Sequence, residues 1–167
     1  MPFRIEKLAK HDRSEFDCGT EALNRYLQRQ AGQDQRKRYA VCFVAVDDDS
    51  EAVSGFYTLS SGSLDLDRLP TSLSQKLPRY QVVPVVVMGR LAVAKSAQGV
   101  GLAQALLFDA TKKVATLNVG AFALLVVDGG HALNHYGGVA DSGRHSSMTV
   151  LSGDTSAGVA KILEELE

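Results

Sequence analysis

The chain has 167 residues, of which 45% are apolar and 22% charged, and this fits one domain, 1–167, with a substantial core. Two cysteines are too few for a disulfide scaffold, no apolar run reaches the roughly 20 residues of a membrane span, and the amino terminus lacks a secretion signal. The net charge of −1 favours no class of partner, so these features together predict a cytoplasmic protein without a membrane segment.

The first third of the chain is predicted to form a strand, a helix and a β-hairpin. Leu23, Tyr26 and Leu27 recur at helical spacing, and the Thr20 hydroxyl is placed to cap the start of that helix. The acidic turn 47–50 separates two apolar segments rich in valine and aromatic residues, which is typical of a hairpin. In chain order we expect a strand at 2–8, a helix at about 21–32, and hairpin strands at 39–47 and 52–61.

The rest of the chain alternates strands with helices. Continuous apolar content predicts that strands at 82–93 and 121–127 are buried on both faces. Pro84 lies near the start of the first of these strands, where a missing N–H donor is best tolerated. The other expected elements are a connection with short helical pieces at 64–80, an amphipathic helix at about 100–117, a short helix around 130–136, a strand near 147–152 and a final helix at 156–166.

A glycine-containing turn, 98–103, lies between strand 82–93 and the helix that follows. Gly99 and Gly101 allow positive φ and let an anion approach the backbone, because they carry no Cβ. A helix amino terminus presents unpaired N–H groups at the positive end of the helix dipole, so the turn predicts a pyrophosphate site. Gly101 is not followed by the Lys-Ser/Thr pair of a P-loop, and Gln104 stands where a dinucleotide fingerprint needs a small residue.

Basic residues concentrate at the start of the chain. Residues 1–40 contain nine Lys and Arg against six Asp and Glu, with Tyr26 and Tyr39 among them. This pattern is compatible with a solvated helix face and strand start, or with a patch that contacts the phosphates of an RNA or another polyanion. The densest group consists of Arg36, Lys37 and Arg38.

Gln98, Gly101 and Ala103 match the pattern Gln/Arg-x-x-Gly-x-Gly/Ala, which resembles the coenzyme A loop of the GCN5-related N-acetyltransferases. This resemblance implies an α/β fold whose mixed central sheet has splayed parallel strands and flanking helices. It also implies acetyl-CoA as the acetyl donor, with its diphosphate on the main chain of the turn and its pantetheine arm along the splayed strand. The implied cofactor-binding residues are Leu91, Ala92, Val93, Gln98, Gly99, Val100, Gly101, Leu102 and Ala103.

Five separated segments resemble one branch of this family, the acetyltransferase toxins of bacterial toxin–antitoxin pairs. The branch implies transfer of acetyl from acetyl-CoA to the amino group of an aminoacyl-tRNA, which blocks translation. It further implies a homodimer and a ribbon-helix-helix antitoxin as the partner. The matching segments, in chain order, are His11–Gly19, Leu23–Leu27, Arg36–Val41, Gly55–Leu59 and Val85–Val93.

The same resemblance implies a catalytic tyrosine at Tyr136. The family carries it in a passage of the form Ala-x-x-Phe-Tyr-x-x-x-Gly-Phe. Here Ala132 and Tyr136 keep the spacing, while His135 replaces the aromatic residue before the tyrosine and Val139 replaces the last phenylalanine. A phenol, with a pKa of about 10, can protonate a departing thiolate. We therefore expect Tyr136 to be the general acid.

Metal chemistry is not expected. His131 and His135 have the i, i+4 spacing of a metal pair, but no Glu follows His131 and no third ligand is evident. On the substrate side, Arg90 could contact a tRNA phosphate or pair with a carboxylate at a dimer interface. The candidates for contact with tRNA are Arg36, Lys37, Arg38 and Arg90.

Two other functions stay open. Basic residues scattered over the fold would favour acetylation of a small amine or a protein amino terminus. The divergent segment after Tyr136 would also suit a catalytically degenerate module that binds coenzyme A or an antitoxin and transfers no acetyl group.

Overall fold

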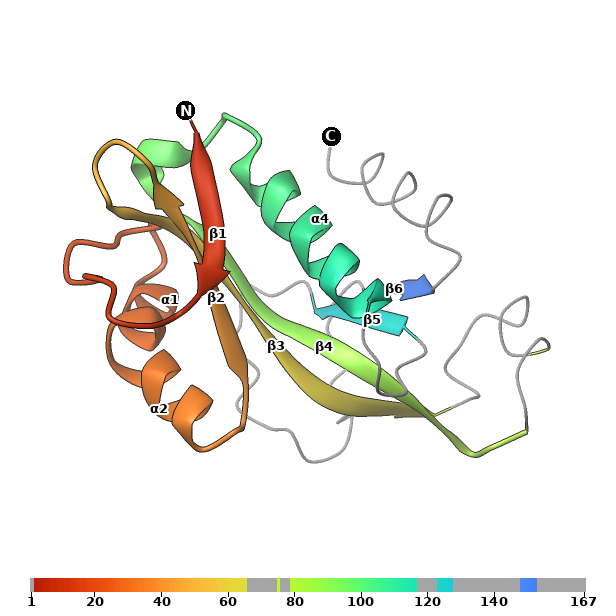
Figure 1. Ribbon diagram of the computed structural model, residues 1–167. Coiled ribbons are helices and arrows are strands. Elements are labelled where there is room, and N and C mark those ends of the chain that lie inside the picture. The colour runs from red at the N-terminus through yellow and green to blue at the C-terminus, as the bar shows by residue number, and fades with distance from the viewer. Residues whose placement is uncertain (1, 66–74, 76–78, 117–122, 128–147, 153–167) are drawn as a thin grey trace.

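The computed structural model describes residues 2–65, 75, 79–116, 123–127 and 148–152, and its strands form one six-stranded sheet in the order β1-β2-β3-β4-β5-β6 (Figure 1). β4 and β5 are parallel, whereas every other neighbouring pair is antiparallel. This mixed sheet with flanking helices confirms the predicted α/β class. The strands are β1 (Phe3–Lys7), β2 (Val41–Asp47), β3 (Val53–Asp65), β4 (Val82–Val93), β5 (Ala123–Val127) and β6 (Met148–Ser152).

Helices lie on both faces of the sheet (Figure 1). A continuous helical segment between β1 and β2 covers one face, and α4 covers the other on its way from β4 to β5. A parallel strand pair needs such a crossover connection. None of the described helices is long and apolar enough to span a membrane. The helical elements are α1 (Glu21–Arg25), a π-helical turn (Tyr26–Gln30), α2 (Ala31–Arg36), a 3-10 turn (Lys95–Ala97) and α4 (Leu102–Ala115).

Two clusters of buried side chains lie on opposite faces of the sheet. In β2, Val44 belongs to the cluster under the α1–α2 segment and its neighbour Ala45 to the cluster under α4, because successive strand residues point to opposite faces. On the α1–α2 side, the ring of Phe56 packs against Phe16 and Tyr26, with centroid distances of 5.6 and 6.2 Å. The central strands are therefore packed on both sides.

The π-helical turn is anchored by the loop that precedes it. The Ala31 N–H donates to the Tyr26 C=O, five residues earlier, which defines the wider turn. The Leu27 C=O accepts a hydrogen bond of 3.1 Å from Arg13 Nη1. Tyr26 and Leu27 both become buried against the sheet in this arrangement.

Several predicted boundaries differ from the structure. The helical segment continues to residue 36 rather than 32, and β3 continues to residue 65, which takes up the start of the predicted connection. Thr20 precedes α1 as predicted, but its hydroxyl makes no capping hydrogen bond. Its carbonyl instead accepts the N–H groups of Leu23 and Asn24, both at 3.1 Å. Most of 66–80, and the predicted helices at 130–136 and 156–166, lie outside the described residues.

The predicted burial of β4 on both faces is wrong for its first half. Val82 is 45% exposed and Pro84 is exposed, whereas Val83 and Val85 are buried. This half of β4 pairs with the long end of β3, and the two strands extend beyond α1 and α2 (Figure 1). The face of this two-stranded segment that carries Val82 and Pro84 is therefore exposed to solvent. The burial expected for strand 121–127 concerns side chains outside the described ones.

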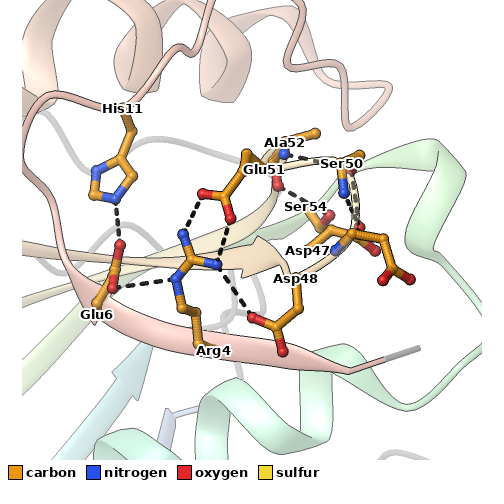
Figure 2. A network of polar contacts seen from close by, with 10 residues as sticks. Arg4, Glu6, His11, Asp47, Asp48, Ser50, Glu51, Ala52 and Ser54 are labelled. Atoms are coloured by element: carbon orange, nitrogen blue, oxygen red, sulfur yellow. Dashed lines mark hydrogen bonds and ion pairs between the residues drawn. The ribbon is translucent and has the colours of Figure 1, made fainter.

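A polar network ties the edge strand β1 to the β2–β3 turn (Figure 2). Arg4 on β1 pairs with Glu51 and, at 3.2 Å, with Asp48. Glu6, on the same strand, lies 2.6 Å from the Nε2 atom of His11. Because Arg4 and its carboxylate partners are partly exposed to solvent, each of their ion pairs contributes little stability by itself, and the network mainly specifies how β1 is positioned.

Candidate functional site

The turn between β4 and α4 has the backbone geometry of an anion site. Gly99 and Gly101 have φ angles of 79° and 81°, and a Cβ added to Gly99 would meet no atom within 4 Å. The first hydrogen bond of α4 runs from the Ala105 N–H to the Gly101 C=O, at 3.1 Å. The N–H groups of residues 102–104 therefore precede the helical bonding pattern and can bind a ligand.

Helix α4 adds a favourable field at this turn. Its N-cap residue is Gly101, so no side-chain oxygen competes for the first N–H groups. Its first turn contains no acidic residue, and its last turn carries Lys112 and Lys113. The positive end of the dipole of this 14-residue helix points at the turn. Shape and charge both fit a diphosphate.

The open edge of β4 lies next to the turn. β4 pairs with β5 only from Val85 to Met88. Within the described part of the chain, residues 89–93 have no strand partner on that edge. The described pairing with β5 therefore stops before the residues expected along the pantetheine arm. Because the residues that follow β5 lie outside the described part of the chain, the splay itself stays a prediction.

A β-bulge at Gly89 lies where this pairing ends. Thr58 pairs with Arg90, but the next residue of β3 pairs with Met88, so Gly89 is an extra residue on β4. The bulge shifts the alternation of side chains, and Met88 and Leu91 both lie in the cluster under α4. Arg90 consequently points to the opposite face, under the α1–α2 segment. A regular alternation read from the sequence misses this shift.

Only alternate residues of the open edge direct main-chain groups into the gap. The Ala94 N–H donates to the Ser54 C=O at 2.8 Å, and the β3–β4 register continues from this pair. Antiparallel neighbours alternate between facing the partner strand and facing away from it. Ala92 therefore faces β3, whereas Leu91 and Val93 face the gap. Of the three residues expected along the pantetheine arm, the structure presents Leu91 and Val93 in this way.

The Gln98 side chain braces the turn. Its Nε2 atom donates to the Val93 C=O at 3.1 Å and to the Cys18 C=O at 3.3 Å. One carbonyl of the open edge is thus already paired, while the Val93 N–H and the main chain of Leu91 have no partner among the residues that the structure describes. Gln98 can therefore serve a cofactor site through its main chain and by holding the turn against β4.

An ion pair holds the amino-terminal loop against the start of the turn. Lys95 Nζ lies 2.8 Å from Asp17 Oδ2, and the Lys95 N–H donates to the Asp17 C=O, also at 2.8 Å. The other carboxylate oxygen accepts from the Gly19 N–H and from Asn24 Nδ2. These contacts, above all the one with Lys95, lower the pKa of Asp17 to about 2. This ion pair was not among the predicted site residues, and the only signal for it in the sequence is Asp17-Cys18-Gly19 within a segment that resembles the family.

This ion pair predicts an acid-dependent stability. Because the pKa of folded Asp17 is about 2 and its usual value is 3.8, the stabilisation is complete above about pH 4 and is lost as the pH falls toward 2. We expect the Tm of Asp17→Asn to fall less steeply than that of the wild type over this range. Thermal unfolding followed by circular dichroism measures the slopes. Lys95→Gln should change the limb in the same direction but by less, because Gly19 and Asn24 still donate to Asp17. Wild-type steepness in both variants would contradict the assignment.

The four candidate tRNA contacts occupy two places. Arg36, Lys37 and Arg38 are exposed together at the end of α2 and form the basic patch. Arg90 lies apart from them in β4, with its guanidinium carbon 3.7 Å from the centroid of the Tyr26 ring. Its Nε atom is buried and has no hydrogen-bond partner in the described part of the chain. The α1–α2 segment connects the two places, since its π-helical turn contributes Tyr26 and its last residue is Arg36.

A buried contact fixes α4 on the sheet. The Tyr57 hydroxyl donates to Asp109 Oδ2 at 2.6 Å, and Lys113 Nζ lies 2.5 Å from the same oxygen. Burial, with Asp109 adding to it, raises the pKa of Tyr57 above its ordinary value. Lys113 also lies 4.6 Å from the centroid of the Phe43 ring. Because α4 begins in the glycine turn, this contact also fixes where the turn lies.

The predicted general acid Tyr136, together with His131 and His135, lies outside the described residues. Among the residues that the structure does describe, no group of three or more His, Cys, Asp or Glu side chains is placed to hold a metal ion. The described part of the site therefore consists of the glycine turn, the open edge of β4 and the basic patch with Arg90.

Comparison with curated proteins shows two toxins similar to this chain, while no family model matches it. The tRNA-acetylating toxin of Mycobacterium tuberculosis (strain ATCC 25618 / H37Rv) is 35% identical over 125 residues, which are 74% of this chain and 70% of that protein. The probable toxin TacT of Sinorhizobium fredii (strain NBRC 101917 / NGR234) is 26% identical over 106 residues. That alignment covers 64% of this chain and 59% of TacT, less than two thirds of its length.

Solved toxin structures share the fold. A tyrosine-to-phenylalanine mutant of KacT has a TM-score of 0.70 and 32% identity, covering 75% of this chain and 78% of that chain. AtaT complexed with acetyl-methionyl-tRNAfMet has a TM-score of 0.69 and 32% identity, covering 75% and 77%. AtaTR bound with acetyl-CoA has a TM-score of 0.70 and 27% identity, covering 96% and 98%.

A mixed sheet with one parallel strand pair, a glycine turn after β4 and a helix that starts from this turn has the architecture of the GCN5-related N-acetyltransferases. The similarity to the curated and solved toxins narrows this class. The chain belongs to the family of acetyltransferase toxins of toxin–antitoxin systems.

Proposed function

We propose that this protein transfers the acetyl group of acetyl-CoA to the α-amino group of an aminoacyl-tRNA, and so blocks translation as the toxin of a toxin–antitoxin pair. The observation that carries the proposal is the glycine turn at the start of α4 beside the open edge of β4. Similarity to known toxins supports aminoacyl-tRNA as the proposed acetyl acceptor. One relative is a tRNA-acetylating toxin, and AtaT has been solved in complex with acetyl-methionyl-tRNAfMet.

The cofactor would be held by main-chain groups. Within the turn 98–103, the N–H groups of residues 99–103 suit the diphosphate, since positive φ at both glycines and the helix dipole favour an anion there. The Gln98 N–H already donates to the Lys95 C=O at 3.5 Å. The main chain of Leu91 and the Val93 N–H suit the amides of the pantetheine arm, because they face away from β3, whereas the Val93 C=O is already bonded to Gln98. When bound, acetyl-CoA supplies an activated acyl group for transfer to an amine.

The proposed acetyl transfer requires few catalytic side chains. The α-amino group of an ester-linked amino acid is only weakly basic, so much of it is neutral near pH 7 and needs no strong general base. The open-edge N–H groups of β4 can stabilise negative charge on the acyl oxygen. In our proposal Tyr136 holds a proton on its hydroxyl oxygen and delivers it to the departing thiolate sulfur as the new amide bond forms.

On the tRNA side, Arg36, Lys37 and Arg38 would contact phosphates. Arg90 would contact the tRNA through the terminal nitrogens of its guanidinium, because its Nε atom is buried. We further propose that the protein acts in the cytoplasm as a homodimer and is neutralised by an antitoxin of the ribbon-helix-helix class. AtaT complexed with its antitoxin AtaR is a precedent for a protein partner of this kind.

Incubation with labelled acetyl-CoA and total aminoacyl-tRNA tests the reaction. We expect label on tRNA that mild base releases as an N-acetylated amino acid, because the aminoacyl ester is base-labile. Label on small amines or protein amino termini instead would support the alternative substrates. Acetyl-CoA binding without any transfer would show a degenerate module.

The basic patch predicts a change in salt dependence. Reversing the charge at Arg36, Lys37 and Arg38 should weaken tRNA binding and lower the slope of log K against log salt by about 2 to 3, because each phosphate contact contributes about 0.7 to 0.9. Filter binding over a salt series measures the slope. Lys112→Glu, on α4 at the other face of the sheet, is the control and should change it little. An unchanged slope in the triple variant would exclude the patch.

A further inference from the structure

The residue that follows the basic patch is an exposed aromatic. Tyr39 is 71% exposed, and among the described residues none stacks on or hydrogen-bonds to its ring. It follows directly on Arg36, Lys37 and Arg38, which are exposed as well. A single exposed tyrosine needs no explanation by itself. Tyr39, however, directly follows three exposed cationic residues, and its main chain is held by hydrogen bonds, so a functional role is worth considering.

The backbone holds Tyr39 in a defined position. Three main-chain hydrogen bonds close the end of α2, from the N–H groups of Lys37, Arg38 and Tyr39 to carbonyls of residues 33–35, at 2.9 to 3.2 Å. Arg38 has a φ of 62°, the left-handed conformation that usually falls to glycine at a helix end. Arg38 therefore occupies a backbone conformation that is strained for a residue with a Cβ and that glycine would adopt without strain.

The sheet register places the start of β2, just after Tyr39, level with the last residue pair between β4 and β5. Val41 pairs with Leu59, the β3 residue that pairs with Met88, and Met88 pairs with Val126 in the last β4–β5 pair. Tyr39 lies two residues before Val41, where the chain passes from α2 into β2 (Figure 1). Strands lie about 4.8 Å apart, so β2 is about 10 Å from β4 across the sheet.

We propose that Tyr39 is a stacking site for an unpaired nucleobase of the acyl-acceptor RNA, with the basic patch holding the adjoining phosphates. This inference rests on the proposed function. A charged tRNA carries unpaired nucleotides next to its aminoacyl ester, and single-stranded bases stack on exposed aromatic side chains while cations track the backbone. The ring is exposed, its main chain is held, and it lies within a few strand spacings of the last β4–β5 pair. A tyrosine that docks a protein antitoxin instead is the alternative that the experiment separates.

The test compares Tyr39→Ala and Tyr39→Phe with Tyr80→Ala, a control in which a 72% exposed tyrosine elsewhere in the chain is removed. Loss of one base–aromatic stack corresponds to about 5- to 150-fold. We expect the KM for aminoacyl-tRNA to rise by that factor in Tyr39→Ala. It should stay within about twofold of wild type in Tyr39→Phe, which keeps the ring, and in Tyr80→Ala. The affinity for acetyl-CoA should be the same in all four proteins.

A binding experiment separates failure of this inference from failure of the proposed function. In a tRNA whose terminal adenine is replaced by 2-aminopurine, stacking quenches the base fluorescence. Wild type and Tyr39→Phe should quench it, and Tyr39→Ala should not, whether or not acetyl is transferred. An active wild type with equal quenching in Tyr39→Ala would overturn the stacking site alone. Normal tRNA kinetics combined with lost antitoxin binding in Tyr39→Ala would assign the tyrosine to the protein partner.

Arg38→Gly provides a second measurement that is independent of the ring. Glycine fits the left-handed backbone, so Tm should not fall, while tRNA affinity should drop and the salt slope should decrease by about 0.7 to 0.9, as for one lost phosphate contact. Full tRNA affinity in this variant would show that the left-handed arginine does not serve the RNA.

Discussion

Replacing Tyr136 by phenylalanine is expected to lower the rate of acetyl transfer by at least about 100-fold, because general acid catalysis contributes about 10²- to 10⁴-fold. Without the phenolic proton the thiolate must leave unprotonated, while the ring still fills its place. The affinity for acetyl-CoA should stay close to wild type. Single-turnover acetylation of aminoacyl-tRNA measures the rate, and calorimetric titration with acetyl-CoA measures the affinity.

The leaving group offers a control for this role. An acetyl thioester of a more acidic thiol needs less proton donation, so the gap between wild type and Tyr136→Phe should narrow with such a donor. A purely structural effect of the substitution would persist with both donors. Tyr80→Phe should behave as wild type. Full activity of Tyr136→Phe with acetyl-CoA would remove Tyr136 from the mechanism.

Replacing Gly101 by aspartate is expected to lower the affinity for acetyl-CoA about 100-fold more than replacing it by asparagine. Both residues tolerate the left-handed backbone that Gly101 adopts, with a φ of 81°, and they have nearly the same shape. They differ by one negative charge, and two like charges about 5 Å apart repel by about 3 kcal/mol at an effective dielectric constant near 20. Calorimetric titration of both variants gives the ratio directly.

Thermal unfolding provides the matching control for the Gly101 pair. Because the two variants share the same backbone strain, their Tm values should be similar, and a difference in affinity then reports the charge alone. The ratio should shrink at high salt, since the turn is open to solvent. Equal affinities for acetyl-CoA in both variants would place the diphosphate elsewhere and would contradict the cofactor site proposed here.

Local pattern predicted most of the described elements. Apolar and β-branched runs indicated β1 to β6, and helical spacing indicated the segment after Thr20 and the helix after Gly101, because these signals depend on neighbours within a few residues. The predictions that were wrong concern features that tertiary contacts decide. The Thr20 hydroxyl is not used as a cap, and the first half of β4 is exposed on one face although its valine content resembles that of a fully buried strand.

The glycine turn could be predicted from the sequence because its requirements are local: two glycines with positive φ after a strand and before a helix. The tertiary structure decided how this turn is held and what lies beside it. Asp17 and Lys95 are 78 positions apart, and Gln98 and Cys18 are 80 apart. Such contacts depend on the sheet register and on the Gly89 bulge, and both result from the packing of whole strands rather than from any short stretch of residues.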